Sequence, residues 1–140
     1  MERYMNANIV FSKFSRDYME LKKDLPIRPS EMAVVNIITK RDGDFTPLAI
    51  AELLGVSKPM IAAHIAVLEK KGYIYKESSM LDKRSFYVRP TDKAKALADE
   101  FEASQTENLK KIEMGLGEES FAELIRLLEK TQTVLDEMKG

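Results

Sequence analysis

The sequence predicts a mainly α-helical protein with one small β-hairpin, in the order α-α-α-α-β-β-α-α. Over most of the chain, apolar residues recur at steps of three and four, which is the period of helices that pack on one face. Between residues 73 and 89 the period changes to two, and aromatic and β-branched residues become frequent, as in strands. With 140 residues, 44% hydrophobic and 32% charged, the chain has the composition of a folded globular unit.

The first helix is expected from about Tyr4 to Lys23. Its apolar residues alternate steps of three and four, which predicts lengthwise packing against another helix. These residues are Tyr4, Ala7, Phe11, Phe14, Tyr18, Leu21 and Leu25. Leu25-Pro26 should end the helix, because a residue that precedes proline disfavours the α conformation. A second helix is expected from Pro29, a good first-turn residue, to the stop signal at residues 41–44.

Two short helices joined by a tight turn are expected next. Thr46 and Pro47 suit a helix start, and Gly55 suits the left-handed conformation of a turn. Ser57 can cap the following helix, which should present Ile61, Ile65 and Leu68 to the core and end at residues 70–72. This pattern predicts a helix-turn-helix whose second helix projects from the surface.

A β-hairpin with a basic tip is expected after Gly72. Its strands should be residues 73–77 and 85–89, and the linker between them contains Asp82-Lys83-Arg84. A hairpin that directly follows a helix-turn-helix makes a winged helix. A helix from about Asp92 to Met114, a break at Gly115 and Gly117, and a last helix from about Glu118 complete the chain.

The composition excludes several kinds of site. There is no Cys and a single His, so disulfides, Cys nucleophiles, thiol switches and His- or Cys-rich metal sites are not expected. We find no paired catalytic constellation and no Gly-rich phosphate loop, and therefore expect neither an enzyme nor a cofactor. No apolar run approaches the ~18–20 residues of a membrane span, so a cytoplasmic protein without membrane contact is expected.

Positive charge is concentrated in the middle of the chain. Residues 57–91 contain seven Lys and Arg against three Asp and Glu, whereas residues 92–140 contain seven against twelve. Lys and Arg that neutralise phosphates supply much of the affinity of proteins for DNA. The charge pattern therefore favours the winged helix as the part that meets a polyanion.

The chain resembles the MarR family of transcriptional regulators over nearly its whole length. The resemblance rests on Pro29-Ser30-Glu31, the helix-turn-helix at 47–71, Lys70-Lys71-Gly72-Tyr73 and the wing sequence Asp82-Lys83-Arg84-Ser85. It implies a homodimer in which residues 1–27 and 92–140 form the dimerisation helices and residues 28–91 bind DNA. It also implies a pseudo-palindromic double-stranded operator and a small aromatic or anionic effector.

By this resemblance the helix that begins at Ser57 enters the major groove, and Arg84 reaches the minor groove or phosphates. Asp82 is placed to orient the Arg84 guanidinium through a charge-assisted pair. The candidate DNA-binding residues are Ser57, Lys58, Met60, Ala63, His64, Val67, Lys71, Lys76, Lys83 and Arg84.

The expected recognition helix departs from the family pattern, because residues 58–70 contain no Arg, Asn or Gln for bidentate contacts to bases. Specificity can then rest on thymine methyls, on His64 or on groove shape, and loose specificity is the alternative. We therefore expect a dimeric DNA-binding regulator, a ligand-responsive repressor by resemblance. The alternative is a winged-helix module that binds protein partners without specific DNA binding.

Overall fold

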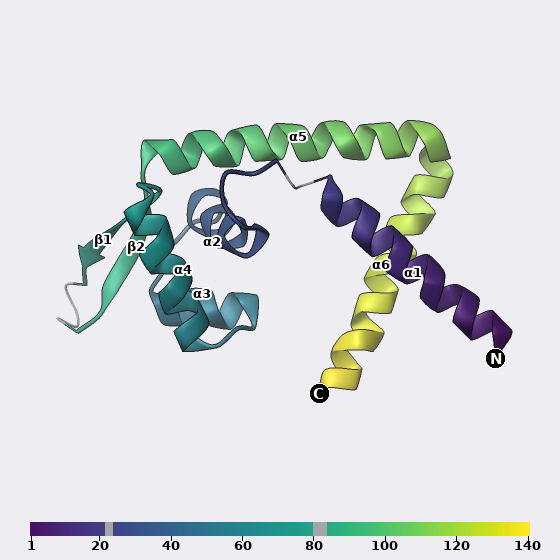
Figure 1. Ribbon diagram of the computed structural model, residues 1–140, viewed down its shortest axis with the longest axis horizontal. Helices are drawn as coiled ribbons and strands as arrows, with labels where there is room; N and C mark the ends of the chain where they lie inside the picture. The colour runs from purple at the N-terminus through teal and green to yellow at the C-terminus, as the bar shows by residue number, and fades with distance from the viewer. Residues whose placement is uncertain (22–23, 80–83) are drawn as a thin grey trace. The chain divides into compact units, whose positions relative to one another are not determined.

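The computed structural model describes residues 1–21, 24–79 and 84–140. Within them, the elements follow the predicted order of four helices, a two-stranded antiparallel hairpin and two helices (Figure 1). The chain forms two compact units, Met1–Glu100 and Phe101–Gly140. Their boundary lies inside helix α5 (Asp92–Leu116).

Helix α1 (Glu2–Glu20) begins earlier and ends earlier than the apolar spacing predicts. Leu21 is its C-terminal cap, so the helix ends before Leu25-Pro26, and the predicted last residues Lys22 and Lys23 lie outside the described residues. No residue of α1 is buried within the single chain. Its apolar seam is therefore exposed, as Tyr4, Phe11 and Phe14 show with 72%, 65% and 48% of their surface accessible.

Local capping chemistry explains where the next three helices begin. In α2 (Pro29–Lys40), the carboxylate of Glu31 accepts a hydrogen bond from the Arg28 backbone N–H at 3.0 Å, which satisfies this buried acid. In α3 (Pro47–Leu54), the Thr46 hydroxyl accepts from the Ala49 N–H at 3.2 Å. In α4 (Lys58–Lys70), the Ser57 hydroxyl accepts from the Met60 N–H at 3.3 Å. The predictions for Thr46 and Ser57 are confirmed.

A compact apolar core joins these helices to the hairpin. Its largest fully buried side chains are Met32, Val34, Val35, Ile50, Ile61, Leu68 and Val88. Ile61, Ile65 and Leu68 recur at helical spacing on one side of α4 and are all buried, as predicted. This spacing fixes which side of α4 faces the core and leaves the opposite side in solvent.

The hairpin pairs β1 (Ile74–Ser78) with β2 (Phe86–Pro90), from Ile74 opposite Pro90 to Ser78 opposite Phe86. Both strands lie one residue later than the sequence predicts. The reason at the first strand is that the Tyr73 N–H donates to the Leu68 carbonyl at 2.9 Å and closes the end of α4. Pairing of the strands therefore begins at Ile74.

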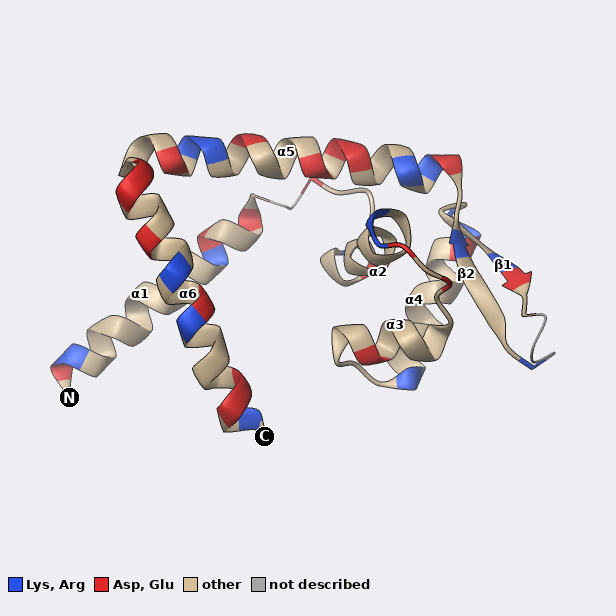
Figure 2. Cartoon of the chain, turned by 180° about the vertical axis from the view of Figure 1, so that it is seen from behind, with Lys and Arg blue, Asp and Glu red and all other residues tan. Residues whose placement is uncertain are grey.

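Two further helices follow the hairpin. Thr91 caps α5 by accepting from the Ala94 N–H at 3.3 Å, and its hydroxyl donates to the Gly72 carbonyl at 2.7 Å. The sequence placed a break at Gly115 and Gly117, but Gly115 remains helical and only Gly117, with φ of 90°, separates α5 from α6 (Glu118–Lys139). Acidic and basic residues are interspersed along both helices (Figure 2).

Candidate nucleic-acid interface

The turn between α3 and α4 has the geometry of a helix-turn-helix. The two helices meet at an angle of 115°, within the range of about 90–120° that is typical of this motif. Gly55 adopts the left-handed conformation with φ of 67°, and the Val56 N–H donates to the Ala51 carbonyl at 3.1 Å. The tight turn and the Ser57 cap together fix the direction in which α4 leaves the turn.

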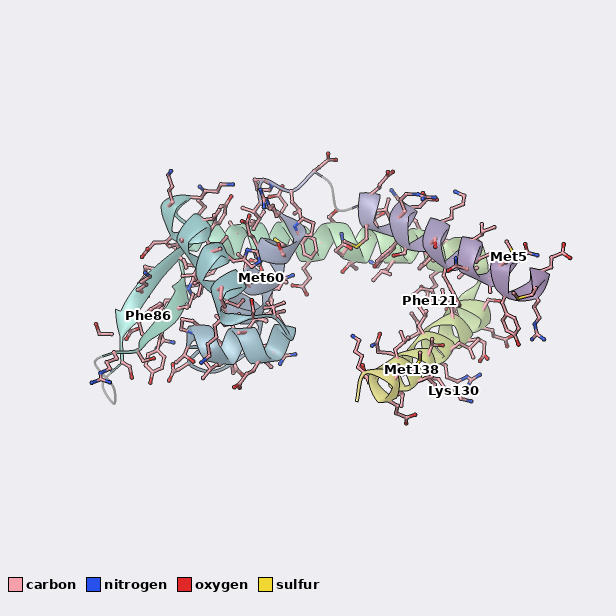
Figure 3. All side chains as sticks on the ribbon, turned by 60° about the horizontal axis from the view of Figure 1, so that its bottom comes forward. Met5, Met60, Phe86, Phe121, Lys130 and Met138 are labelled. Atoms are coloured by element: carbon pink, nitrogen blue, oxygen red, sulfur yellow. The ribbon has the colours of Figure 1, made fainter. Side chains whose placement is uncertain are left out.

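The outward side of α4 is apolar and formed mainly of small side chains. Ala62, Ala63 and Ala66 are exposed, and Met60 is 47% exposed. The half-buried residues His64 and Val67 lie at the edge of this surface. Small side chains allow the backbone of a helix to approach a groove closely, while Met60 (Figure 3) is long enough to reach beyond them.

Exposed basic residues lie at both ends of α4 and on the wing. Lys58 follows the Ser57 cap and is exposed, and Arg84 is exposed just before β2. Lys71, also exposed, is the C-terminal cap of α4. Asp82 and Lys83, which the sequence singled out, lie outside the described residues, and so does the predicted pair between Asp82 and Arg84.

An apolar groove of about 720 Å³ runs between the start of α3, one side of α4 and the wing. Ile61, Ala62, Ile65, Ala66 and Phe86 (Figure 3) form much of its wall. Three basic residues, Lys58, Lys76 and Arg84, also line it. Cationic side chains from α4 and from the wing therefore lie along the same groove, on one side of the winged helix.

The structure gives Lys76 a contact that its place in the sequence does not reveal. Its Nζ lies 3.6 Å from a carboxylate oxygen of Glu69 on α4 and 4.9 Å from the centre of the Phe86 ring. Lys76 thus connects the wing to α4 as well as lining the groove. Lys76 therefore forms an ion pair with Glu69. Lys58, in contrast, makes no ion pair among the described residues.

Arg89 on β2 is the residue whose role sequence reasoning missed. Arg89 contributes to the positive charge counted over residues 57–91, but its Nε donates to Glu77 at 2.6 Å and its Nη1 donates to Asp44 at 2.7 Å. These hydrogen bonds, first to Glu77 and then to Asp44, raise the pKa of Arg89 above its usual range. Strand alternation alone places Arg89 and Glu77 on one side of the hairpin, but the partner Asp44 is distant in the sequence.

The described residues contain no group of three or more His, Asp or Glu side chains that would hold a metal ion. In the same part of the chain, no single helix is long and apolar enough to cross a membrane. Among the described helices, α3 and α4 reach that length and apolarity only when counted together, and a bend of 115° separates them.

A helix-turn-helix followed directly by a two-stranded wing defines a winged-helix protein. Comparison with known proteins agrees, since residues 25–85 match the family model described as MarR family. Streptococcus pneumoniae FabT, solved in complex with DNA, has a TM-score of 0.86 and 22% identity, covering 96% of this chain and 99% of that chain.

Two further solved structures share the fold. The S. aureus MepR–DNA complex has a TM-score of 0.72 and 20% identity, with 94% of this chain and 96% of that chain covered. The YusO protein from Bacillus subtilis has a TM-score of 0.72 and 19% identity, with 94% and 93% covered. The family match covers the winged helix, and these solved structures share the fold over nearly the whole length of the chain.

Proposed function

We propose that this protein is a DNA-binding transcriptional regulator that binds a pseudo-palindromic duplex as a homodimer. The observation that carries the proposal is the α3–α4 helix-turn-helix, whose second helix has an exposed outer side between Lys58 and the wing residue Arg84. Such a helix enters the major groove, while phosphate contacts from flanking cations hold it in place. The MarR-family match over residues 25–85 and the DNA complexes of FabT and MepR support the proposal.

Selection of bound duplexes from a random library by the purified protein tests this function. We expect enrichment of a symmetric site with half-site centres about 34 Å, or about 10 base pairs, apart. Affinity should fall steeply as salt rises, because bound phosphates release counterions. Recovery of no enriched sequence, together with weak binding at low salt, would favour a winged-helix module for protein partners instead.

We infer that the homodimer is built from α1, α5 and α6. The apolar seam of α1 is exposed in the single chain, and so are large apolar residues of α6, including Leu127, Leu128, Leu135 and Met138. A soluble chain rarely leaves so many large apolar side chains uncovered on its helices. Covering it with the same surface of a second copy gives the two-fold symmetry that a palindromic site requires.

Base recognition in this proposal uses apolar contacts. The outer side of α4 offers Met60 and Ala63, with His64 and Val67 beside them, and no Arg, Asn or Gln. The thymine C5-methyl is the apolar group that bases present in the major groove. We therefore expect half-sites in which one or more thymines lie opposite Met60 and Ala63.

Replacement of single thymines by deoxyuridine tests this readout, because it removes only the methyl group. One buried methyl is worth ~0.8 kcal/mol, so affinity should fall about fourfold for each contacted thymine. Met60→Ala should remove the sensitivity at one position of each half-site, whereas Lys130→Ala on α6 should leave it unchanged. Uniform insensitivity to deoxyuridine would exclude methyl readout without excluding DNA binding.

The regulator is proposed to be a cytoplasmic repressor that a small aromatic or anionic effector releases from DNA. This part follows from the resemblance to the MarR family, and no catalytic or cofactor role is proposed. Titration of the protein–operator complex with small aromatic acids, followed by fluorescence anisotropy, tests it. Complexes that no such compound dissociates would argue against effector control of this kind.

A further inference from the structure

Arg89 is held by acidic residues from two other segments of the winged helix. Its guanidinium donates to Glu77 on β1 at 2.6 Å and to Asp44 in the loop before α3 at 2.7 Å. Its carbon Cζ lies 5.0 Å from the centre of the Tyr87 ring. Only 23% of the side chain is exposed, although both carboxylates are more than half exposed. The cation is therefore enclosed by its partners at the surface.

A backbone contact joins the same segments. The Val88 N–H donates to the Phe45 carbonyl at 2.8 Å, so residue 45 pairs with the free edge of β2. Val88 itself is in the core, and Arg89 follows it on the opposite side of the hairpin. Asp44 and Phe45 thus attach the loop before α3 to the wing through one side-chain bond and one backbone bond.

We propose that Arg89 is a positioning residue for DNA binding that holds the wing at a fixed angle to the helix-turn-helix through Asp44 and Glu77. The proposal rests on the proposed function. The wing is a two-stranded ribbon, and such ribbons are weakly stable on their own. The loop that carries Asp44 leads directly into Thr46 and α3, so the clamp ties the base of the wing to the start of the helix-turn-helix. A wing fixed in this way presents Arg84 without first having to become ordered, which favours tight binding.

The alternative role for Arg89 is a direct contact with phosphate, and the two roles predict opposite effects of the same substitution. If Arg89 contacts DNA, Asp44→Asn removes a competing carboxylate and a negative charge, and DNA affinity should rise. If Arg89 is a clamp, Asp44→Asn removes one of its anchors, and affinity should fall although the surface becomes more positive.

The test compares operator affinity of Asp44→Asn, Glu77→Gln and Arg89→Lys with that of the wild-type protein, by anisotropy at two salt concentrations. Asp99→Asn is the matched control, because Asp99 on α5 forms an exposed ion pair with Lys40 of α2 at 2.5 Å and is not a partner of Arg89. We expect Asp44→Asn and Glu77→Gln each to weaken binding about three- to tenfold, and the control to change it less than about twofold. Arg89→Lys keeps the charge but cannot donate to two carboxylates in the same fixed geometry, so it should weaken binding as well.

A second measurement separates positioning from general loss of structure. Because the clamp acts through the wing, Arg84→Ala should cost less affinity in the Asp44→Asn background than in the wild-type protein, by about half. Thermal unfolding of Asp44→Asn should stay close to that of the wild type, since its side chain is exposed. Unchanged or tighter binding by Asp44→Asn and Glu77→Gln, or additive effects with Arg84→Ala, would overturn the clamp. Wild-type protein that binds no DNA would overturn the proposed function itself.

Discussion

Removal of the two basic side chains Arg84 and Lys58 should affect DNA binding differently. Arg84 is exposed just before β2, and Lys58 is exposed in the first turn of α4. A residue on the wing meets phosphates or the minor groove, whereas one in the first turn of a recognition helix reaches base edges. We therefore expect Arg84→Ala to weaken binding to every sequence, and Lys58→Ala to weaken binding mainly to the preferred one.

The magnitude for Arg84 follows from counterion release. Each phosphate contact contributes about 0.9 to the slope of log affinity against log salt, so loss of one contact per protomer lowers the slope of a dimer by about 1.8. Between about 50 and 200 mM salt, the wild-type protein should then lose about twelvefold more affinity than the variant. For Lys58, loss of one base contact should cost ~1–3 kcal/mol per half-site at a single base position.

The assay is fluorescence anisotropy with a selected operator and a scrambled duplex over a salt series. Lys130→Ala on α6 is the charge-matched control and should keep the wild-type slope. Both variants should unfold at the wild-type temperature, because both side chains are exposed. An Arg84→Ala protein with unchanged affinity and slope would refute the reasoning and favour the protein-binding module.

Three further substitutions test the fold and the dimer. Ile61→Ala should lower the free energy of unfolding in urea by ~2–5 kcal/mol, because the side chain is fully buried in the core; a change below ~1 kcal/mol would contradict this packing. Gly55→Ala should cost about 1 kcal/mol, measured by thermal unfolding, because φ is +67° while an added Cβ meets nothing within 4 Å. Phe11→Glu should convert the dimer to a monomer in light scattering, because it places a charge in the apolar seam of α1; a wild-type monomer at micromolar concentration would contradict the dimer.

Helix positions in the winged helix were predictable because the signals that set them are local. Thr46 and Ser57 each accept a hydrogen bond from an N–H three residues further on, so a few adjacent letters determine where α3 and α4 begin. Strand bounds depend on contacts with other elements. The first strand begins one residue late because the Tyr73 N–H is used by the end of α4, which periodicity does not show.

The break after α5 illustrates a different limit. Both Gly115 and Gly117 are compatible with a helix end, and the sequence does not say which of them adopts a positive φ. In the structure only Gly117 does, and Gly115 costs the helix some stability without ending it. The two glycines therefore predicted a break near the correct place, and the backbone conformation of Gly117 sets where the helix ends.

The positive charges of residues 57–91 look equivalent in the sequence but differ in their surroundings in the structure. A count over residues 57–91 gives every Lys and Arg the same weight. The structure divides them, because Arg89 is bound to Glu77 and Asp44, and Lys76 is close to Glu69, whereas Lys58 has no ion pair among the described residues. A Lys or Arg side chain that is already paired with a carboxylate neutralises phosphates less effectively, and so releases fewer counterions from DNA, than a side chain without such a partner. Arg89 should therefore add little to the salt dependence of binding and should influence affinity through the orientation of the wing.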